Sequence, residues 1–126
     1  MLGPHMLTKH FKVGEFRCHC CGEIKNYLMV AEMLERLREA IKMPITVNSG
    51  YRCYARNAII GGEIDSLHLI GKAADITCDN LDALKAAALQ EPMCRGVGLY
   101  STHVHVDMRV GNGLVWADGL YMARRV

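Results

Sequence analysis

The sequence predicts a single α+β domain in which a small, largely antiparallel sheet packs against helices. Three observations support this prediction: the length of 126 residues, two segments with helical apolar periodicity, and short strand-like segments between and after them. A chain of this length is long enough for one hydrophobic core and too short for two independent ones. The last strand-like segments are joined by short connections, which favours antiparallel pairing.

Two helices are expected. In the first, residues 28–42, apolar residues recur at helical spacing and Pro44 enforces the end. These apolar residues are Val30, Met33, Leu34, Leu37 and Ile41. The second helix is LDALKAAALQ, residues 81–90, for which Asp79 or Asn80 can supply the N-cap.

Strands are predicted for ITVNS, KAADITC, GVGLY and HVHVDMR, which are residues 45–49, 72–78, 96–100 and 103–109. The tail GLVWADGLYMA, residues 113–123, is expected to add one more strand. Residues 7–26 have no clear period and are predicted to form an irregular lead. Residues 50–65 are bounded by glycine and are predicted to form a loop with a short helical turn.

Composition argues against several classes of protein. The net charge is +2 and no run of Lys and Arg forms a basic stripe, so no nucleic-acid partner is expected. No apolar stretch approaches the length of a membrane span, and the N-terminus lacks the layout of a signal peptide. The opening MLGPHM resembles a cloning or protease-site remnant, so residues 1–5 are assigned to a tag and residues 6–126 to one domain. The domain is expected to be a monomer.

The chain has six cysteines, at positions 18, 20, 21, 53, 78 and 94. Without a signal peptide, free thiols are the default prediction, with Cys18, Cys20 and Cys21 packed in a turn before the first helix. The run CHCC could instead ligate a structural metal. No second close pair of cysteines completes a zinc-finger spacing, so the sequence favours the free thiols.

The segment HVHVDMR places polar side chains together on one face of a predicted strand. Alternation puts the two valines and the methionine on the face that belongs in the core. The opposite face then carries two imidazoles and a carboxylate, from His103, His105 and Asp107. A solvent-facing strand does not require such a row, so we expect it to line a site.

The segment SLHLIGKAAD adds His68 and Asp75. Asp75 lies in a strand predicted to be buried, where an unpaired carboxylate is costly. Two imidazoles and one carboxylate form a common catalytic zinc set with an open fourth position for water. We therefore predict that His68, Asp75 and His105 bind Zn²⁺, which would neutralise Asp75 and polarise a scissile carbonyl. Alternatively, the histidines are structural and arginine or backbone N–H groups hold Asp75.

The sequence resembles the zinc D-alanyl-D-alanine carboxypeptidase-like peptidases. The residues that carry the resemblance, in the order and spacing of that family, are SGYR at 49–52, Asn57, GG at 61–62, SLHLIGKAAD at 66–75 and VHVD at 104–107. The family shares a fold with the hedgehog signalling domain and includes bacterial wall enzymes and phage endolysins. The resemblance runs from about Phe11 to Arg109 and implies zinc ligands at His68, Asp75 and His105.

The resemblance also implies roles for residues around the metal. Arg52 would bind a carboxylate or carbonyl of the substrate, which suits the forked guanidinium. Ser66 would orient the ligand loop by hydrogen bonding, and Asp107 would orient a ligand histidine. Gly71 would permit the close turn between ligands. A structural ion pair is the alternative for both Arg52 and Asp107.

The general base is the point at which the sequence departs from the family. Several members carry an acidic residue three positions before the last ligand histidine, and here that residue is Thr102. His103 could supply the function because it shares a strand face with His105. Alternatively, His103 only forms part of the pocket wall, and Glu63 or Asp65 is the general base.

These features predict a zinc metallopeptidase that cleaves peptidoglycan stem peptides next to a D-amino acid, as a carboxypeptidase or an endopeptidase. The alternative is a non-catalytic zinc domain of the same fold that binds the wall or a protein. Thr102 favours this alternative because it stands where several family members carry the acidic general base. Synthesis in the cytoplasm and action at the cell wall are expected, as for a phage or prophage lysin. Tyr100 and Trp116 could line the substrate groove or belong to the core.

Overall fold

The computed structural model describes residues 2–117 and 120–125, with side chains described up to residue 117. Its helices are η1 (Val13–Phe16), α1 (Leu28–Ile41), α2 (Tyr54–Ile59), η2 (Leu67–Ile70) and α3 (Leu81–Gln90). Its strands are β1 (Thr46–Ser49), β2 (Ala73–Thr77), β3 (Gly96–Leu99), β4 (Val104–Asp107), β5 (Gly113–Ala117) and β6 (Leu120–Arg125).

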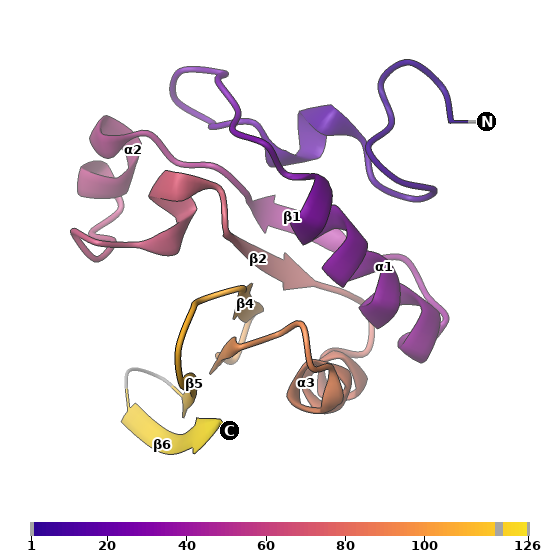
Figure 1. Ribbon diagram of the computed structural model, residues 1–126, viewed down its shortest axis with the longest axis vertical. Helices are drawn as coiled ribbons and strands as arrows, with labels where there is room; N and C mark the ends of the chain where they lie inside the picture. Colours follow the sequence, from indigo (N-terminus) through magenta and orange to yellow (C-terminus); the bar gives the residue numbers. More distant parts are fainter. Residues whose placement is uncertain (1, 118–119, 126) are drawn as a thin grey trace.

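The strands form one sheet in the order β1-β2-β4-β3-β5-β6 (Figure 1). Every neighbouring pair is antiparallel except β3 and β5, which are parallel. The predicted α+β class with a largely antiparallel sheet is therefore confirmed. The prediction of one strand in the tail is wrong, because β5 and β6 are two strands; residues 118–119 between them lie outside the described residues. Strand β5 pairs with the free edge of β3 and runs parallel to it because β4 ends, and β5 begins, beside the first residue of β3: Gly96 is opposite both Asp107 and Leu114.

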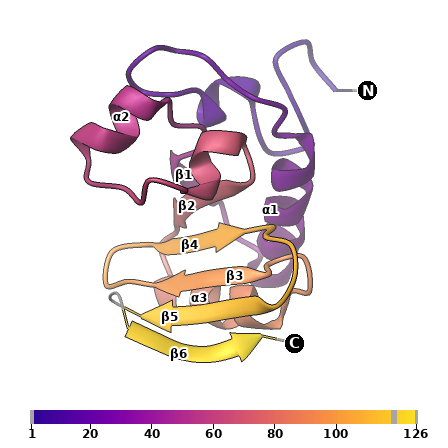
Figure 2. The same ribbon diagram turned by 60° about the vertical axis from the view of Figure 1, so that its left-hand side comes forward.

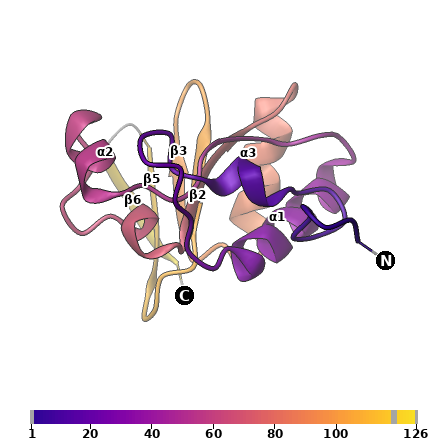
Figure 3. The same ribbon diagram turned by 90° about the horizontal axis from the view of Figure 1, so that it is seen from above.

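The sheet carries helices α1 and α3 on one face, while α2 and η2 lie beyond the other face near β1 and β2 (Figures 2 and 3). The core lies between the sheet and the first pair of helices. Val104 and Val106 of β4 belong to it, together with Leu34 of α1 and Leu84 of α3. Because side chains alternate along a strand, the residues between these valines and beyond them point to the opposite face. This alternation brings the polar residues of β2 and β4 to the side of the sheet that carries the candidate site.

Both predicted helices are confirmed. The buried side of α1 is formed by Val30, Ala31, Met33, Leu34 and Leu37. The N-cap of α3 is Asn80, whose Oδ1 accepts a hydrogen bond from the N–H of Ala83 at 3.1 Å, which distinguishes it from the alternative Asp79. Within the described chain, no helix has the length and apolar character needed to cross a membrane.

The N-terminal lead is more ordered than its lack of period suggests. Phe16 at the end of η1 is completely buried, and its ring stacks on Tyr27 with 5.0 Å between centroids. Phe11 is buried beside it at 6.2 Å. Because these rings supply the hydrophobic contacts, the lead needs no helical periodicity to become part of the core.

Candidate metal centre

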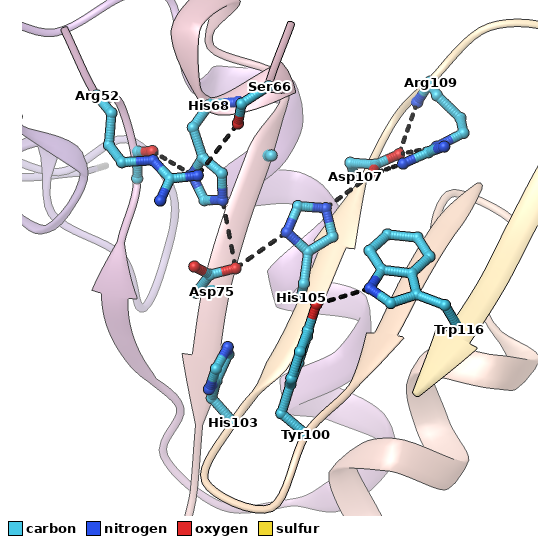
Figure 4. Close-up of polar contacts among 12 residues, drawn as sticks. Arg52, Ser66, His68, Asp75, Tyr100, His103, His105, Asp107, Arg109 and Trp116 are labelled. Carbon is cyan, nitrogen blue, oxygen red and sulfur yellow. Dashed lines mark hydrogen bonds and ion pairs between the residues drawn. The ribbon is translucent and has the colours of Figure 1, made fainter. Parts of the chain in front are cut away.

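The three predicted zinc ligands converge on the face of the sheet opposite α1 and α3 (Figure 4). Asp75 of β2 and His105 of β4 are register partners on neighbouring strands, and His68 comes from η2. Oδ1 of Asp75 lies 3.0 Å from Nδ1 of His105 and 3.3 Å from Nε2 of His68. One ligand atom from each residue lies within 4.8 Å of the others. Tertiary structure thus assembles a donor set whose members are up to 37 residues apart.

The local structure of η2 delivers His68 to this point. Ser66 is the N-cap of η2, and its Oγ accepts a hydrogen bond from the N–H of His68 at 3.2 Å. Gly71 ends η2 in the left-handed region with φ of 75°. A side chain at this position would also crowd Lys25. Both features let the chain turn back directly from the histidine into β2.

The second nitrogen of each imidazole is held by an oxygen acceptor. Nδ1 of His68 lies 2.7 Å from the carbonyl oxygen of Gly50, and Nε2 of His105 lies 2.8 Å from Oδ2 of Asp107. With these two nitrogens protonated, an assignment from the hydrogen-bond network, His68 Nε2 and His105 Nδ1 are the nitrogens that face Asp75 and whose lone pairs would bind a metal ion once they lose any proton shared with Asp75. Two such imidazoles and a carboxylate are a ligand set that fits Zn²⁺ and leaves a fourth position open.

Electrostatics keep the carboxylates ionised. Burial acts to raise the pKa of Asp75, but hydrogen bonds from His105 and His68 outweigh it and hold the pKa well below its usual range. For Asp107, burial is likewise outweighed by hydrogen bonds from Arg109 and His105, so its pKa is also low. Burial would lower the pKa of His105, but hydrogen bonds with Asp107 and Asp75 raise it overall. A metal ion binding here would therefore displace a proton.

Asp107 is fixed from several sides. It is completely buried, and Arg109 donates to it from Nε at 2.9 Å, from Nη2 at 2.7 Å and from the backbone N–H at 3.1 Å. On the neighbouring strand β3, a side chain at Gly96 would overlap the Asp107 carboxylate. The structure therefore holds Asp107 in one orientation toward His105.

A groove of about 470 Å³ lies beside the ligand set. Its lining includes Arg52, Glu63, Asp65, His105 and Trp116. The indole of Trp116 is held by a hydrogen bond from its Nε1 to the hydroxyl of Tyr100 at 2.7 Å, and its ring lies 5.2 Å from that of His105. Of the two aromatic residues considered from the sequence, Trp116 lines the groove and Tyr100 positions it. A hollow of about 480 Å³ beside Glu35 and Pro44 lies away from these ligands.

Arg52 lines the groove next to the ligand loop. Its Nη2 donates to Oγ of Ser66 at 3.1 Å, and its backbone N–H donates to the carbonyl of His68 at 3.2 Å. Its Nε is buried and has no hydrogen-bond partner among the described residues. Burial lowers the pKa of Arg52, partly offset by the charge of Asp75. A guanidinium in this position has donors left for an acceptor in the groove.

His103 occupies a different environment from His105. Its ring stacks on Tyr100 with 4.6 Å between centroids and 8° between planes, and its Nδ1 lies 2.9 Å from Oγ1 of Thr102. Figure 4 shows its ring below Asp75 on the side of the sheet that carries the ligands. The structure thus brings His105 and Asp107 together with the other predicted residues, whereas the contacts of His103 are with Tyr100 and Thr102.

Sequence reasoning missed two contributions to the site. The carbonyl of Gly50 is a backbone group, so no residue type indicates that it binds His68. Asn57 is buried, and its Nδ2 donates to the carbonyl of Glu63 at 2.7 Å, which holds the loop along the groove. The close approach of Gly62 to the Asn57 side chain supports the same loop. Asn57 and the glycine pair are visible in the sequence, but only the structure shows that the asparagine side chain holds the backbone six residues further along.

The chain belongs to the Peptidase M15 family, whose sequence profile matches residues 9–107. It is also 31% identical over 99 residues to the zinc D-Ala-D-Ala carboxypeptidase of Streptomyces albus G. That similarity covers 73% of this chain and 38% of the relative, so the chain spans well under half of the relative's length. The family resemblance expected from the sequence is confirmed. The predicted ligands, Arg52 and Asp107 all lie within the matched region.

Proposed function

We propose that this protein is a zinc metallopeptidase that hydrolyses peptidoglycan stem peptides next to a D-amino acid. The observation that carries the proposal is the convergence of His68, Asp75 and His105 beside a groove, with both imidazoles oriented by oxygen acceptors. Membership of a peptidase family and similarity to a protein named zinc D-Ala-D-Ala carboxypeptidase support it. Bound zinc supplies a Lewis acid that activates water and polarises a scissile carbonyl.

Arg52 is proposed to bind the substrate. Arg52 lines the groove, and within the described residues its side chain donates one hydrogen bond, to Ser66, so further N–H donors remain for the terminal carboxylate of a stem peptide, which a guanidinium grips bidentately. A carbonyl oxygen of an internal peptide bond is the corresponding acceptor for an endopeptidase. Ser66 supports this role because its hydroxyl contacts both the guanidinium of Arg52 and the backbone of His68.

Asp107 and Ser66 are proposed to act through other residues. Asp107 holds the ring of His105 and fixes which nitrogen faces the metal, while Ser66 caps the short helix that carries His68. Each acts on a ligand histidine and not on the substrate, so both are positioning residues.

His103 is proposed as the general base, in place of the acidic residue that other family members carry at the position of Thr102. Nδ1 lies 2.9 Å from Oγ1 of Thr102; with the ring proton on Nδ1 and donated to that oxygen, Nε2 is the nitrogen available for a proton from water. Glu63 and Asp65 also line the groove and are the alternative candidates for the general base. His103→Ala, Glu63→Gln and Asp65→Asn should be compared by their pH profiles, and the residue whose replacement removes the rising limb is the base.

The test is mass spectrometry of purified peptidoglycan fragments after incubation with zinc-loaded protein, with a chelated sample as control. Loss of one terminal alanine would establish a carboxypeptidase, and a cut within the stem or cross-bridge an endopeptidase. If zinc-loaded protein released no product from any fragment yet bound them, the domain would be a non-catalytic binding module and the proposal would be wrong. We further propose that the domain acts at the cell wall and as a monomer; size-exclusion chromatography checks the latter.

A further inference from the structure

A second cluster of metal-ligating side chains lies away from the candidate zinc site. The thiols of Cys18, Cys21 and Cys53 lie within 4.8 Å of one another. Cys18 and Cys21 belong to the loop after η1, whereas Cys53 is the N-cap of α2 and follows Arg52 directly. None of these three is in a disulfide bond. Cys53 supplies the partner that the run CHCC lacks in the sequence.

The spacing of the sulfur atoms suits a shared metal ion better than a disulfide. Sγ of Cys18 and Sγ of Cys53 are 3.6 Å apart. A disulfide joins its sulfurs at about 2.05 Å. In a tetrahedral zinc–thiolate site with Zn–S bonds of about 2.3 Å, the sulfurs are about 3.8 Å apart. The pair therefore already has nearly the separation that a zinc ion requires.

The loop that carries two of the cysteines is closed by its own backbone. The N–H of Gly22 donates to the carbonyl of Cys18 at 2.9 Å, and the N–H of Cys18 donates to the carbonyl of Glu23 at 2.8 Å. Gly22 has a φ of 73°, which a residue with a side chain rarely adopts. This tight turn directs Cys18 and Cys21, a C-x-x-C pair, to the same side, a spacing common in structural zinc sites.

Backbone N–H groups point at two of the three sulfur atoms. The N–H groups of Cys20 and Cys53 both point at Sγ of Cys18 at 3.4 Å, and the N–H of Arg56 points at Sγ of Cys53 at 3.4 Å. The thiolate is the form that binds metal.

We propose that the thiolates of Cys18, Cys21 and Cys53 bind a structural Zn²⁺ ion. This site is separate from the candidate catalytic centre and does not depend on the proposed peptidase activity. Coordination mainly by cysteine thiolates is typical of zinc sites that hold structure together.

The ion would join the N-terminal lead to the segment that carries Arg52. Two backbone hydrogen bonds already connect this segment to its surroundings: the N–H of Tyr51 donates to Phe16 at 2.9 Å, and the N–H of Arg52 donates to His68 at 3.2 Å. A metal bridge at the next residue, Cys53, would hold Arg52 from its other side. The second zinc ion would therefore stabilise the fold and the position of Arg52 without contacting substrate.

The experiment measures metal in the full-length protein purified under reducing conditions. Two zinc ions per chain are expected in the wild type and one in Asp75→Ala. After exchange with Co²⁺, the wild type and Asp75→Ala should both show the sulfur-to-cobalt charge-transfer absorption that only thiolate ligands produce. Cys18→Ser and Cys53→Ser should lose this band. Cys78→Ser is the matched control, since Cys78 donates to the carbonyl of Asn80 outside the cluster.

The wild-type spectrum needs no variant to fold, so the absence of the band from it is decisive by itself. Cobalt-loaded wild type without a thiolate band would overturn it, as would a band that Cys18→Ser and Cys53→Ser both retain. A disulfide between Cys18 and Cys53 in peptide maps of protein purified and digested without reductant would also overturn it. Failure to cleave peptidoglycan would count against the proposed function and leave the thiolate band unchanged, so the two failures are distinguishable.

Discussion

The carboxylate of Asp107 lies 2.8 Å from Nε2 of His105 and is completely buried. The two residues are on the same face of β4, two positions apart, so the strand itself places them side by side. The carboxylate accepts the ring N–H and thereby fixes Nδ1 as the nitrogen that faces Asp75. This contact links the packing of the sheet to the affinity of the candidate zinc site.

Replacement of Asp107 by Asn should weaken zinc binding while nearly conserving shape. The amide can still accept from the His105 ring, but it removes the negative charge that raises the basicity of the ligand. Partners of metal-bound histidines typically contribute about 10–100-fold to affinity, and we expect a loss in this range. Competition with a chromophoric chelator measures it. An Asp107→Asn variant with wild-type zinc affinity would show that Asp107 serves only the ion pair with Arg109.

Replacement of Gly96 by Ala should impair the same site from the neighbouring strand. The new methyl group would overlap the Asp107 carboxylate, so either the strand or the carboxylate must move. We expect a loss of about 1–3 kcal/mol in the free energy of unfolding and weaker zinc binding. Gly14→Ala is the control, because a side chain there meets nothing within 4 Å. Equal behaviour of the two variants in chemical denaturation would contradict the prediction.

Replacement of Arg52 by Lys should separate substrate binding from catalysis. Lysine keeps the positive charge but has no fork to grip a carboxylate. If Arg52 binds the substrate in the ground state and the transition state alike, KM should rise about tenfold or more with little change in kcat. Steady-state kinetics on a stem peptide provide the measurement. Arg36→Lys is the control; Arg36 is exposed on α1, so both constants should stay unchanged. A fall in kcat alone for Arg52→Lys would contradict a role in binding the ground state of the substrate.

Replacement of Glu35 by Gln should change how stability depends on pH. Burial acts to raise the pKa of Glu35, but hydrogen bonds from the side chain and backbone of His10, at 2.6 and 2.8 Å, outweigh it and lower the pKa. A carboxylate with a lowered pKa stabilises the fold above its unfolded-state pKa, and this contribution disappears as the pH falls through the folded-state pKa. The wild type should therefore be more stable than Glu35→Gln near neutrality, and the difference should vanish in acid.

Urea unfolding at a series of pH values checks this expectation. Glu32→Gln is the matched control, since Glu32 is exposed on the same helix. A stability difference between the wild type and Glu35→Gln that stayed constant down to strongly acidic pH would contradict the assignment. The result matters for the fold because the contact joins the N-terminal lead to α1.

Several features of this protein could be predicted from local pattern. The apolar spacing of residues 28–42 indicates α1, because a helix must place one face in the core. The alternation in HVHVDMR puts His105 and Asp107 on the polar face of β4, because successive side chains of a strand point to opposite faces and the valines occupy the core. His68 and Asp75 were identified because a carboxylate in a buried strand needs a partner, and the family resemblance selects the same residues.

Other features were decided by tertiary structure alone. The parallel pairing of β5 with β3 depends on β5 beginning beside the first residue of β3, which no local pattern records. His103 is predicted on the same strand face as His105, yet its ring stacks on Tyr100. The approach of Cys53 to Cys18 and the carbonyl of Gly50 behind His68 join residues far apart in the chain. Periodicity reports which face a side chain occupies, whereas only the packing of distant segments determines what that side chain meets there.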